Sequence, residues 1–581
     1  MVPEVNFNNI TSLFRNAETD GRNFLYEHET YELLRNSGAE TPPKAILLDK
    51  GTRFSEELLS NLPGEKVVLK IVSPTIFHKT DIGGVKIIDN NPDQIRSQTR
   101  RMMDEVPEKF AQWLTRNPDQ VPDGYLGLTG ELLQQAIAKD LRGVLLCQFM
   151  PPDSAAFGNE LLVSIRRTRE FGMIITAGLG GTDTELYAQR FKKGQAVVSA
   201  STELTNGERF FKLFQKTIAF KKLAGVARGQ TRIVSNDQLI ECFGSFIEMA
   251  NTYSPKNPDA PFVIDELEIN PFAFTDYKMV PLDGICRFSQ PEKLPAGRPI
   301  QKIESLLHPQ SIALIGVSDK KVNFGRIILQ NVIAAGFDKS KIMIVKPDTE
   351  KIDGVPCYPS LKELPEKADL FVVAIQAEAV PDLIDDIIAT DCANSVMLIP
   401  GGLGEKKGSE ERAGKIVEKI NTAHLSENGG PIFLGGNSMG VVSHPGKFDT
   451  IFIPKEKLPE SNTSSKQNAA FISQSGAFII TRTSKYPFLD PAYLISIGNQ
   501  NDLTVGDLVS YIKDLDHIDV IAIYMEGFND LDGLSLSKAI RSAVLNGKDV
   551  VFYKAGRTPE GKSATSGHTA SVAGDYMVCE S

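Results

Sequence analysis

The sequence predicts a multi-domain α/β protein with an N-terminal α+β half and two doubly wound α/β domains after it. Its 581 residues correspond to about four domains of roughly 150 residues, too many for one compact core. From residue 302 onward, short β-branched runs alternate with amphipathic segments, which is typical of parallel sheets covered by helices on both faces. The first half lacks this alternation, so we expect it to fold differently.

The strands of the first C-terminal domain are expected at 311–316, 341–345, 368–375 and 395–399, with helices at 325–336 and 380–390. The same rhythm restarts after Gly430, and it predicts strands at 431–434, 469–472, 493–497, 520–524 and 550–553 and a helix at 534–545. These runs are continuously apolar, as strands buried on both faces must be. A second α/β domain therefore follows the first.

In the N-terminal half, we expect a helix near 29–36 and strands at 45–48, 67–72 and 263–268. The segment 290–299 carries three prolines and a glycine in ten residues, which favours a linker over a helix or strand. The predicted domains are 1–290 in two subdomains, a linker at 291–300, and α/β domains at 301–429 and 430–581.

The composition excludes several classes of protein. With 41% hydrophobic and 23% charged residues, the chain is neither disordered nor collagenous. A net charge of −10 without a basic block disfavours nucleic acid as a partner. The six cysteines are widely spaced, which argues against a zinc or redox site and favours a reducing, cytoplasmic compartment. No signal peptide or apolar stretch of bilayer length is evident, so we expect no membrane association.

The loop from Gly316 to Gly325 follows a predicted strand and opens a helix, which places backbone N–H groups where an anion would bind. It lacks a complete G-x-G-x-x-G, and Asp348 is only an approximate match to a ribose-binding acid. A dinucleotide, a phosphate-bearing nucleotide such as coenzyme A, and a glycine turn without a ligand all remain open at this point.

Three further segments lie where strands of the last domain are expected to end. Glu526 follows one strand, where an acid can orient an imidazole or simply cap a helix. The residues 473–477, Ser-Gln-Ser-Gly-Ala, form a strand-to-helix turn that can offer amides to a phosphate or serve only as a cap. The segment 499–502 also follows a strand.

His568 lies in a run of glycine, alanine, serine and threonine at 563–574, which cannot form a core. A lone exposed histidine is usually a bystander, but a small-residue loop directly after a strand is an unusual place for one. An imidazole there can act as a nucleophile that takes a phosphoryl group covalently.

The N-terminal half offers a second set of polar residues. His78 lies in a loop after the strand that bears Lys70, and Lys70 is placed to meet a phosphate. The run 266–271, Glu-Leu-Glu-Ile-Asn-Pro, and Asp283 supply oxygen ligands suited to Mg²⁺, and 178–181 forms a phosphate-sized glycine turn. The alternative is a structural loop and a hairpin with solvated acids.

Together these motifs resemble the NDP-forming acyl-CoA synthetases, which include the ADP-forming acetyl-CoA synthetases and are related to succinyl-CoA synthetase. The motifs that carry the resemblance are Val68-Leu-Lys-Ile-Val-Ser-Pro, His78-Lys-Thr-Asp-Ile-Gly-Gly, Gly178-Leu-Gly-Gly, Glu266-Leu-Glu-Ile-Asn-Pro, Ile315-Gly-Val-Ser, Gly435-Gly-Asn-Ser-Met-Gly, Ser473-Gln-Ser-Gly-Ala, Ser496-Ile-Gly-Asn, Tyr524-Met-Glu-Gly and Ser566-Gly-His-Thr. The resemblance implies an ATP-grasp N-terminal region, a Rossmann-like CoA-binding domain and a flavodoxin-like ligase domain.

The resemblance also implies residue roles. His568 would be the phosphorylated histidine, Glu526 its stabilising acid, and His78 a second phosphoryl acceptor near the nucleotide. Asn270 and Asp283 would ligate Mg²⁺. The residues expected to bind nucleotide or coenzyme A are Lys70, Gly178, Gly180, Gly181, Gly316, Ser318, Lys346, Ser473, Ser475 and Gly476.

The implied reaction converts acyl-CoA, phosphate and ADP reversibly into carboxylate, coenzyme A and ATP, through an acyl phosphate and a phosphohistidine. ATP or ADP, Mg²⁺ and coenzyme A would be the cofactors, and a small carboxylic acid the substrate. A homo-oligomer, at least a dimer, is expected. The segment 556–574 would carry the phosphoryl group between domains, since an extended chain reaches up to roughly 3.3 Å per residue.

Two departures from the family pattern bear on this hypothesis. The family usually has Gly-Pro-Asn-Cys-Leu-Gly where this chain has Gly-Gly-Asn-Ser-Met-Gly at 435–440, so the acyl preference is open. Family members also usually carry a further α/β domain beyond the histidine loop, whereas this sequence stops at Ser581. The alternatives are a regulatory or acyltransferase relative without ligase turnover, and an NAD-dependent oxidoreductase using the Gly316 loop.

Overall fold

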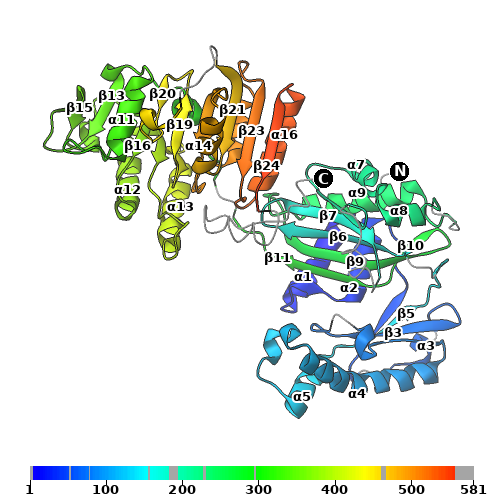
Figure 1. Ribbon diagram of the computed structural model, residues 1–581. Helices are drawn as coiled ribbons and strands as arrows, with labels where there is room; N and C mark the ends of the chain where they lie inside the picture. The colour runs from blue at the N-terminus through cyan, green and yellow to red at the C-terminus, as the bar shows by residue number, and fades with distance from the viewer. Residues whose placement is uncertain are drawn as a thin grey trace. The chain divides into compact units, whose positions relative to one another are not determined.

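The computed structural model describes residues 4–556 except for 52–53, 60, 77–78, 155–157, 182–193, 227–230, 294–295 and 460–465. The chain divides into two compact units (Figure 1). The first is built from residues up to Glu292, and the second from Lys293 onward together with Arg169–Phe171.

The smaller sheet of the first unit is antiparallel, with the strand order β2-β5-β3-β4. Its strands are β2 (Ala45–Asp49), β3 (Lys66–Val72), β4 (Val85–Asp89) and β5 (Gly143–Gln148). Its helices are α3 (Glu56–Leu59), α4 (Pro92–Arg116) and α5 (Gly130–Asp140), and α4 and α5 cover one face (Figure 1). Alternate residues of β3, Val67, Leu69 and Ile71, are buried in the core of this layer.

The larger sheet of the first unit is also antiparallel, in the order β1-β11-β9-β6-β7-β8 with β10 paired to β9. Its strands are β1 (Phe24–Leu25), β6 (Leu161–Thr168), β7 (Gly172–Leu179), β8 (Val197–Ser201), β9 (Val263–Thr275), β10 (Lys278–Pro281) and β11 (Gly284–Ser289). Its helices are α1 (Phe7–Thr19), α2 (Glu27–Ser37), α7 (Gly207–Phe214), α8 (Ile218–Leu223) and α9 (Asn236–Thr252). A phenylalanine-rich core joins these helices to the sheet.

Capping interactions at both ends of α2 fix where the helix begins and ends. The Glu29 carboxylate accepts a hydrogen bond from the backbone N–H of Tyr26 at 2.7 Å, which satisfies one of the donors left free at a helix start. Gly38 ends the helix in the left-handed conformation, with φ of 79°. Glu27 consequently lies in the first turn of α2.

The first sheet of the second unit has the order β14-β15-β13-β12-β16-β17-β18, parallel except for β14. Its strands are β12 (Ile312–Ile315), β13 (Ile342–Val345), β14 (Lys351–Ile352), β15 (Val355–Tyr358), β16 (Ala368–Val373), β17 (Ala393–Leu398) and β18 (Ile432–Gly435). Its helices are α10 (Ile303–Leu307), α11 (Phe324–Ala334), α12 (Val380–Thr390) and α13 (Glu410–His424).

One predicted boundary is wrong. The strand expected to open the last domain, at 431–434, is instead β18, which pairs in parallel with β17 through Ser395 and Ile432. The first α/β sheet therefore extends past the predicted boundary at 429/430. An apolar run shows that a strand is buried, but it does not reveal which sheet the strand joins.

The second sheet of this unit has the order β20-β19-β22-β21-β23-β24, and its last four strands are parallel. Its strands are β19 (Gly440–Ser443), β20 (Phe448–Asp449), β21 (Gln467–Ser473), β22 (Pro491–Ser496), β23 (Val520–Met525) and β24 (Asp549–Lys554). Its helices are α14 (Gly476–Lys485), α15 (Val505–Ile512) and α16 (Asp532–Leu545). The predicted fold class, an α+β half followed by two α/β domains, is confirmed.

The last residues of the proline-rich segment predicted as a linker are anchored within the second unit by Arg298. Arg298 donates to Asp502 and to Asp507, each at 3.1 Å, and His424 Nε2 donates to the same Asp502 at 3.0 Å. Across the part of the chain that the structure describes, no helix is both long and apolar enough to cross a bilayer.

Candidate functional site

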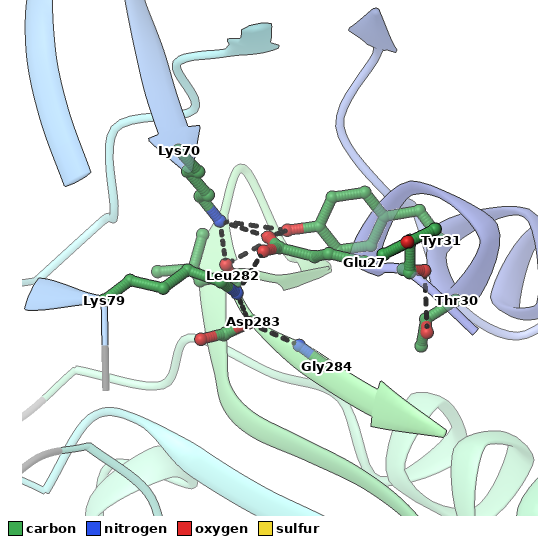
Figure 2. Close-up of polar contacts among 9 residues, drawn as sticks. Glu27, Thr30, Tyr31, Lys70, Lys79, Leu282, Asp283 and Gly284 are labelled. Carbon is green, nitrogen blue, oxygen red and sulfur yellow. Dashed lines mark hydrogen bonds and ion pairs between the residues drawn. The ribbon is translucent and has the colours of Figure 1, made fainter. Parts of the chain in front are cut away.

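A cluster of charged side chains forms in the first unit, where α2, β3 and the start of β11 meet (Figure 2). The ammonium of Lys70 donates to Glu27 Oε1 at 2.6 Å, to the Tyr31 hydroxyl at 3.1 Å and to the backbone carbonyl of Leu282. An ammonium has three donors, so every donor of Lys70 is already engaged. Lys70 is the residue that sequence reasoning selected for the nucleotide phosphate.

Lys79 joins this cluster from the loop after β3. Its ammonium donates to Glu27 Oε2 at 2.6 Å and to Asp283 Oδ1 at 2.9 Å. Lysines and carboxylates therefore alternate in the order Lys70, Glu27, Lys79, Asp283, and we call these four residues the charged cluster (Figure 2). The Glu27 side chain is 4% exposed and that of Asp283 is 37% exposed, so the Asp283 end faces solvent.

The electrostatics of the charged cluster follow from this alternation. Burial by itself would raise the pKa of Glu27, but the two adjacent ammonium groups hold it well below its usual range. The pKa of Lys79 is raised, because Asp283 and Glu27 outweigh the cost of burying its charge. Burial raises the pKa of Asp283, with Lys79 acting in the opposite direction.

A cavity of about 300 Å³ adjoins the charged cluster. Glu27 and Lys79 are among its lining residues, as are Ser73 and Pro74 after β3 and Gly284 on β11. Lys70 is absent from the described residues that line it. The lysine that can reach a ligand in this cavity is therefore Lys79, which sequence reasoning missed because it lies in a polar loop rather than on a strand.

The two residues expected to bind Mg²⁺ are neighbours. The backbone N–H of Asn270 donates to the carbonyl of Asp283 at 3.2 Å, and Asn270 Oδ1 accepts from the N–H of Gly181 at 2.9 Å. Within the described residues, no group of three histidine, cysteine or acidic side chains could hold a metal. Mg²⁺, however, is commonly held by one or two oxygen ligands together with substrate phosphates and water, so this pair fits that ion.

The glycines of the turn that bears Gly181 are required by close packing. A Cβ on Gly178 would lie 3.0 Å from the Cα of Val197, and one on Gly180 would lie 2.7 Å from the carbonyl carbon of Leu161. Gly181 has a φ of +97°, which side chains disfavour. The glycines thus allow the backbone N–H of Gly181 to reach the Asn270 side chain, and this contact does not require a bound phosphate.

Two predicted catalytic residues, His78 and His568, lie outside the described residues. Their roles stay predictions.

In the second unit, a cavity of about 900 Å³ lies at the carboxyl ends of β12, β16 and β17. Ligands gather at this edge of open parallel sheets. The predicted Gly316 lines the cavity, and three cationic residues that sequence reasoning did not select also line it, namely Lys406, Lys407 and Arg412. Gly316 has a φ of +93°, and a Cβ there would collide with the carbonyl of Ala374.

A second glycine turn holds the cationic residues beside this cavity. The Glu405 carboxylate accepts from the backbone N–H groups of Gly402 and Leu403, the latter at 3.1 Å, and from the Asn499 amide at 2.8 Å. Arg412 donates to the carbonyl of Gly402 at 2.8 Å. The glycines at 401, 402 and 404 follow an apolar strand, as Gly316 does, and this was the signal that could have located the turn.

The other predicted residues of the Gly316 loop make contacts within the unit. Ser318 Oγ accepts from the N–H of Lys321 at 3.2 Å, and Lys346 forms an ion pair with Asp319 at 3.2 Å. The Asn323 side chain ties the loop to Gly316 and caps α11. Neither Ser318 nor Lys346 belongs to the described lining of the cavity.

Glu526 is buried at the end of β23, where several groups hold it. Gln474 Oε1 accepts from the backbone N–H groups of Glu526 and Gly527 at 2.7 and 3.0 Å. The Tyr524 hydroxyl donates to Glu526 Oε1 at 3.2 Å, and Lys554 donates to the Glu526 carbonyl at 2.6 Å. Burial and the neighbouring Glu526 raise the pKa of Tyr524, so its hydroxyl stays a donor.

The turn at 473–476 lies next to Glu526, because Gln474 is part of it. Ser473 Oγ donates to the Ser475 carbonyl at 2.7 Å, and Ser475 Oγ accepts from the Phe478 N–H at 3.3 Å as the cap of α14. The serine side chains are therefore used in the turn, and any anion there would meet the backbone of Gly476 and the helix start.

Three protein-family models together match most of the chain. The ATP-grasp domain model matches residues 16–115 and 114–287, the CoA binding domain model matches 310–443, and the succinyl-CoA ligase like flavodoxin domain model matches 466–581.

Curated relatives include three ADP-forming acetate–CoA ligase chains. Ligase II of Archaeoglobus fulgidus is 24% identical over 95% of this chain and 70% of its own length. The ligase I subunit alpha of Pyrococcus furiosus is 32% identical over 48% of this chain and 57% of its own. The ligase I subunit beta of the same organism is 29% identical over 43% of this chain and 87% of its own. The matches thus cover 70%, 57% and 87% of these three relatives, respectively.

Among solved structures, an acetyl-coenzyme A synthetase 1 of Ca. Korarchaeum cryptofilum in complex with phosphate and ADP is 30% identical. The match covers 48% of this chain and 57% of that chain, with a TM-score of 0.42. The three domain models in this order and the relatives together identify the chain: it belongs to the family of NDP-forming acyl-CoA synthetases.

Proposed function

We propose that this chain is an acid–thiol ligase that interconverts acyl-CoA, phosphate and ADP with carboxylate, coenzyme A and ATP. The observation that carries the proposal is the presence of ATP-grasp, CoA-binding and ligase domain models in one chain, in that order. Each of the first two regions also contains a cavity with cationic residues on its wall.

In the proposed first step, phosphate attacks the acyl carbon of the thioester, which releases coenzyme A and leaves an acyl phosphate. His568 then attacks the phosphorus, so that the carboxylate leaves and a phosphohistidine forms. The phosphoryl group finally passes to ADP, with His78 as a second acceptor, and ATP is formed. The steps sum to the overall reaction, and no oxidant or reductant is needed.

In the second unit, the described residues support this scheme in two ways. Lys406, Lys407 and Arg412 present positive charge to the larger cavity, where the phosphates of coenzyme A require it. Glu526 is held by Gln474 and Tyr524, and its carboxylate can stabilise the imidazolium that His568 becomes as it takes up the phosphoryl group. Its burial strengthens that interaction.

In the first unit, Asn270 and Asp283 would hold Mg²⁺, and Lys79 would meet a nucleotide phosphate. The metal would neutralise charge on the transferring phosphoryl oxygens. A small carboxylic acid is the expected substrate, and we expect a cytoplasmic homo-oligomer.

The test is phosphorylation of the chain itself. Incubation with radiolabelled ATP and Mg²⁺ should give a phosphoprotein that is labile in acid and stable in base, as expected of a phosphohistidine. The label should be lost in His568→Ala and retained in His517→Ala, which removes an exposed histidine bound to the Tyr493 hydroxyl. A wild-type chain that takes up no label would overturn the proposal.

A further inference from the structure

The charged cluster contains two lysines with different freedom to bind a ligand. All three donors of Lys70 are engaged by Glu27, Tyr31 and the Leu282 carbonyl. Lys79 makes two hydrogen bonds, to Glu27 and Asp283, which leaves one N–H without a partner among the described residues. Lys79 also lines the cavity, so it is the lysine that an incoming phosphate meets first.

Asp283 is the most exposed member of the charged cluster, and its Oδ1 is already occupied. That oxygen accepts from Lys79 at 2.9 Å and from the N–H of Gly284 at 2.9 Å (Figure 2). A divalent cation that uses this carboxylate must come within about 2.1 Å of an oxygen atom, where it repels the lysine ammonium. The ammonium therefore lies next to any cation that this carboxylate binds, and it lowers the affinity of the carboxylate for that cation.

We propose that Lys79 occupies the Asp283 carboxylate when the nucleotide site is empty and releases it to Mg²⁺ when a nucleotide phosphate binds the ammonium. Metal and nucleotide then bind as a coupled pair, and the metal alone binds weakly. This inference rests on the proposed function, because it takes Asp283 as a metal ligand and the cavity as the nucleotide site.

Charge balance favours this coupling. In the empty site, two lysines face two carboxylates, so the charged cluster is close to neutral. Adding Mg²⁺ alone puts two further positive charges beside the Lys79 ammonium, and adding phosphate alone leaves Asp283 without its cationic partner. Adding both compensates each change, which is the condition for a favourable coupling free energy.

Glu27 limits the movement that Lys79 must make when it passes from Asp283 to a phosphate. Its two oxygens are divided between the lysines, Oε1 to Lys70 and Oε2 to Lys79. Lys79 can leave Asp283 while it keeps Glu27, so only the far end of one side chain has to move. Lys70 and Tyr31 hold Glu27 in place on its other side, and these two are positioning residues in this scheme.

The test measures binding without turnover, on the full chain. Binding of Mn²⁺, used in place of Mg²⁺, is followed by electron paramagnetic resonance with no nucleotide present, and binding of ADP is followed by calorimetry in EDTA. Lys79→Met and Lys79→Gln should bind Mn²⁺ more tightly than wild type, on the order of tenfold, a typical coupling between sites. The same variants should bind metal-free ADP more weakly by a similar factor.

Three controls make the result specific. Lys86→Met removes an exposed lysine on β4 and should change neither affinity. Lys79→Arg keeps the positive charge, so its Mn²⁺ affinity should stay near that of wild type. In Lys79→Met, the additional change Asp283→Asn should abolish the gain in Mn²⁺ affinity, which assigns the gain to this carboxylate.

The inference is supported if one neutral Lys79 variant binds Mn²⁺ more tightly and metal-free ADP more weakly than wild type. A neutral Lys79 variant that binds Mn²⁺ no better than wild type would overturn it, as would a parallel loss of both affinities with an unchanged circular dichroism spectrum. Because two neutral variants are used, misfolding of one leaves the other to decide. The result is also separable from the proposed function, since failure of His568 labelling with the opposite-signed shifts intact would refute the chemistry and not the coupling.

Discussion

Glu40 should make the stability of the first unit fall as the pH rises towards neutrality. It follows α2 and is buried, and its Oε2 is hydrogen bonded to the Ser37 hydroxyl. Ser37 Oγ also donates to the Leu34 carbonyl at 2.7 Å, and a hydroxyl has one proton. A protonated Glu40 that donates to Ser37 satisfies both contacts, whereas an ionised Glu40 does not.

Burial raises the pKa of Glu40 to about 7, from 4.5 for an ordinary glutamate. The native state therefore holds this proton more tightly than the unfolded state. The resulting stability is fully present below pH 4.5 and is lost as the pH rises to 7. A shift of this size corresponds to about 3 kcal/mol. Glu40→Gln cannot ionise, so it should remove this pH dependence and stabilise the unit at pH 8 by up to that amount.

Hydrogen exchange measured by mass spectrometry on the full chain can detect this locally. Peptides from α2 and α9, which pack around Glu40, should exchange more slowly in Glu40→Gln at pH 8, by up to roughly 100-fold after correction for intrinsic rates. At pH 4.5 the two proteins should exchange alike. The matched control is Glu32→Gln on the exposed side of α2. An unchanged pH dependence in Glu40→Gln would refute the reasoning.

Two further predictions concern the larger cavity. Lys406→Met should weaken coenzyme A binding about tenfold in calorimetry, because one charged contact to a phosphate is lost, while ADP binding stays unchanged. Lys415→Met, an exposed lysine paired with Glu411 on α13, is its control, and equal losses in both variants would contradict the assignment. Gly316→Ala should lower stability by about 1–3 kcal/mol, because both the positive φ and the Ala374 carbonyl oppose a side chain. Gly336→Ala, where φ is +95° but no atom lies within 4 Å of the added Cβ, should cost less in the same thermal unfolding assay.

Much of the fold could be predicted because its signals are local. The apolar runs that mark β12, β16 and β17 each lie within a few residues, and their alternation with helices is visible along the chain. The strand predicted at 431–434 was assigned to the wrong sheet, because strand pairing is not local. β18 joins β17 across the whole length of α13, and no feature of its own sequence selects that neighbour.

In the candidate sites, too, single residues could be identified from the sequence, but the contacts between distant residues could not. Lys70 could be selected because it lies on an apolar strand, but Glu27 is 43 residues away and reads as an ordinary acid in the first turn of a helix. Their contact exists only because the fold brings the first turn of α2 to the Lys70 side chain of β3. Lys406 was missed because its neighbours, Glu-Lys-Lys-Gly-Ser, are typical of a solvated loop. The burial of a side chain and its contacts with other helices, strands or loops depend on the tertiary fold, so they could not be identified from a single sequence.

The most direct test of the proposed reaction is to phosphorylate the chain from the acyl side. Wild-type protein mixed with radiolabelled phosphate, acetyl-CoA and Mg²⁺, without nucleotide, should acquire an acid-labile label and release an equal amount of free coenzyme A thiol. Addition of ADP should then transfer the label to ATP, and His568→Ala should acquire none. If thiol is released without a labelled protein, or the label is unchanged in His568→Ala, the phosphohistidine route is contradicted.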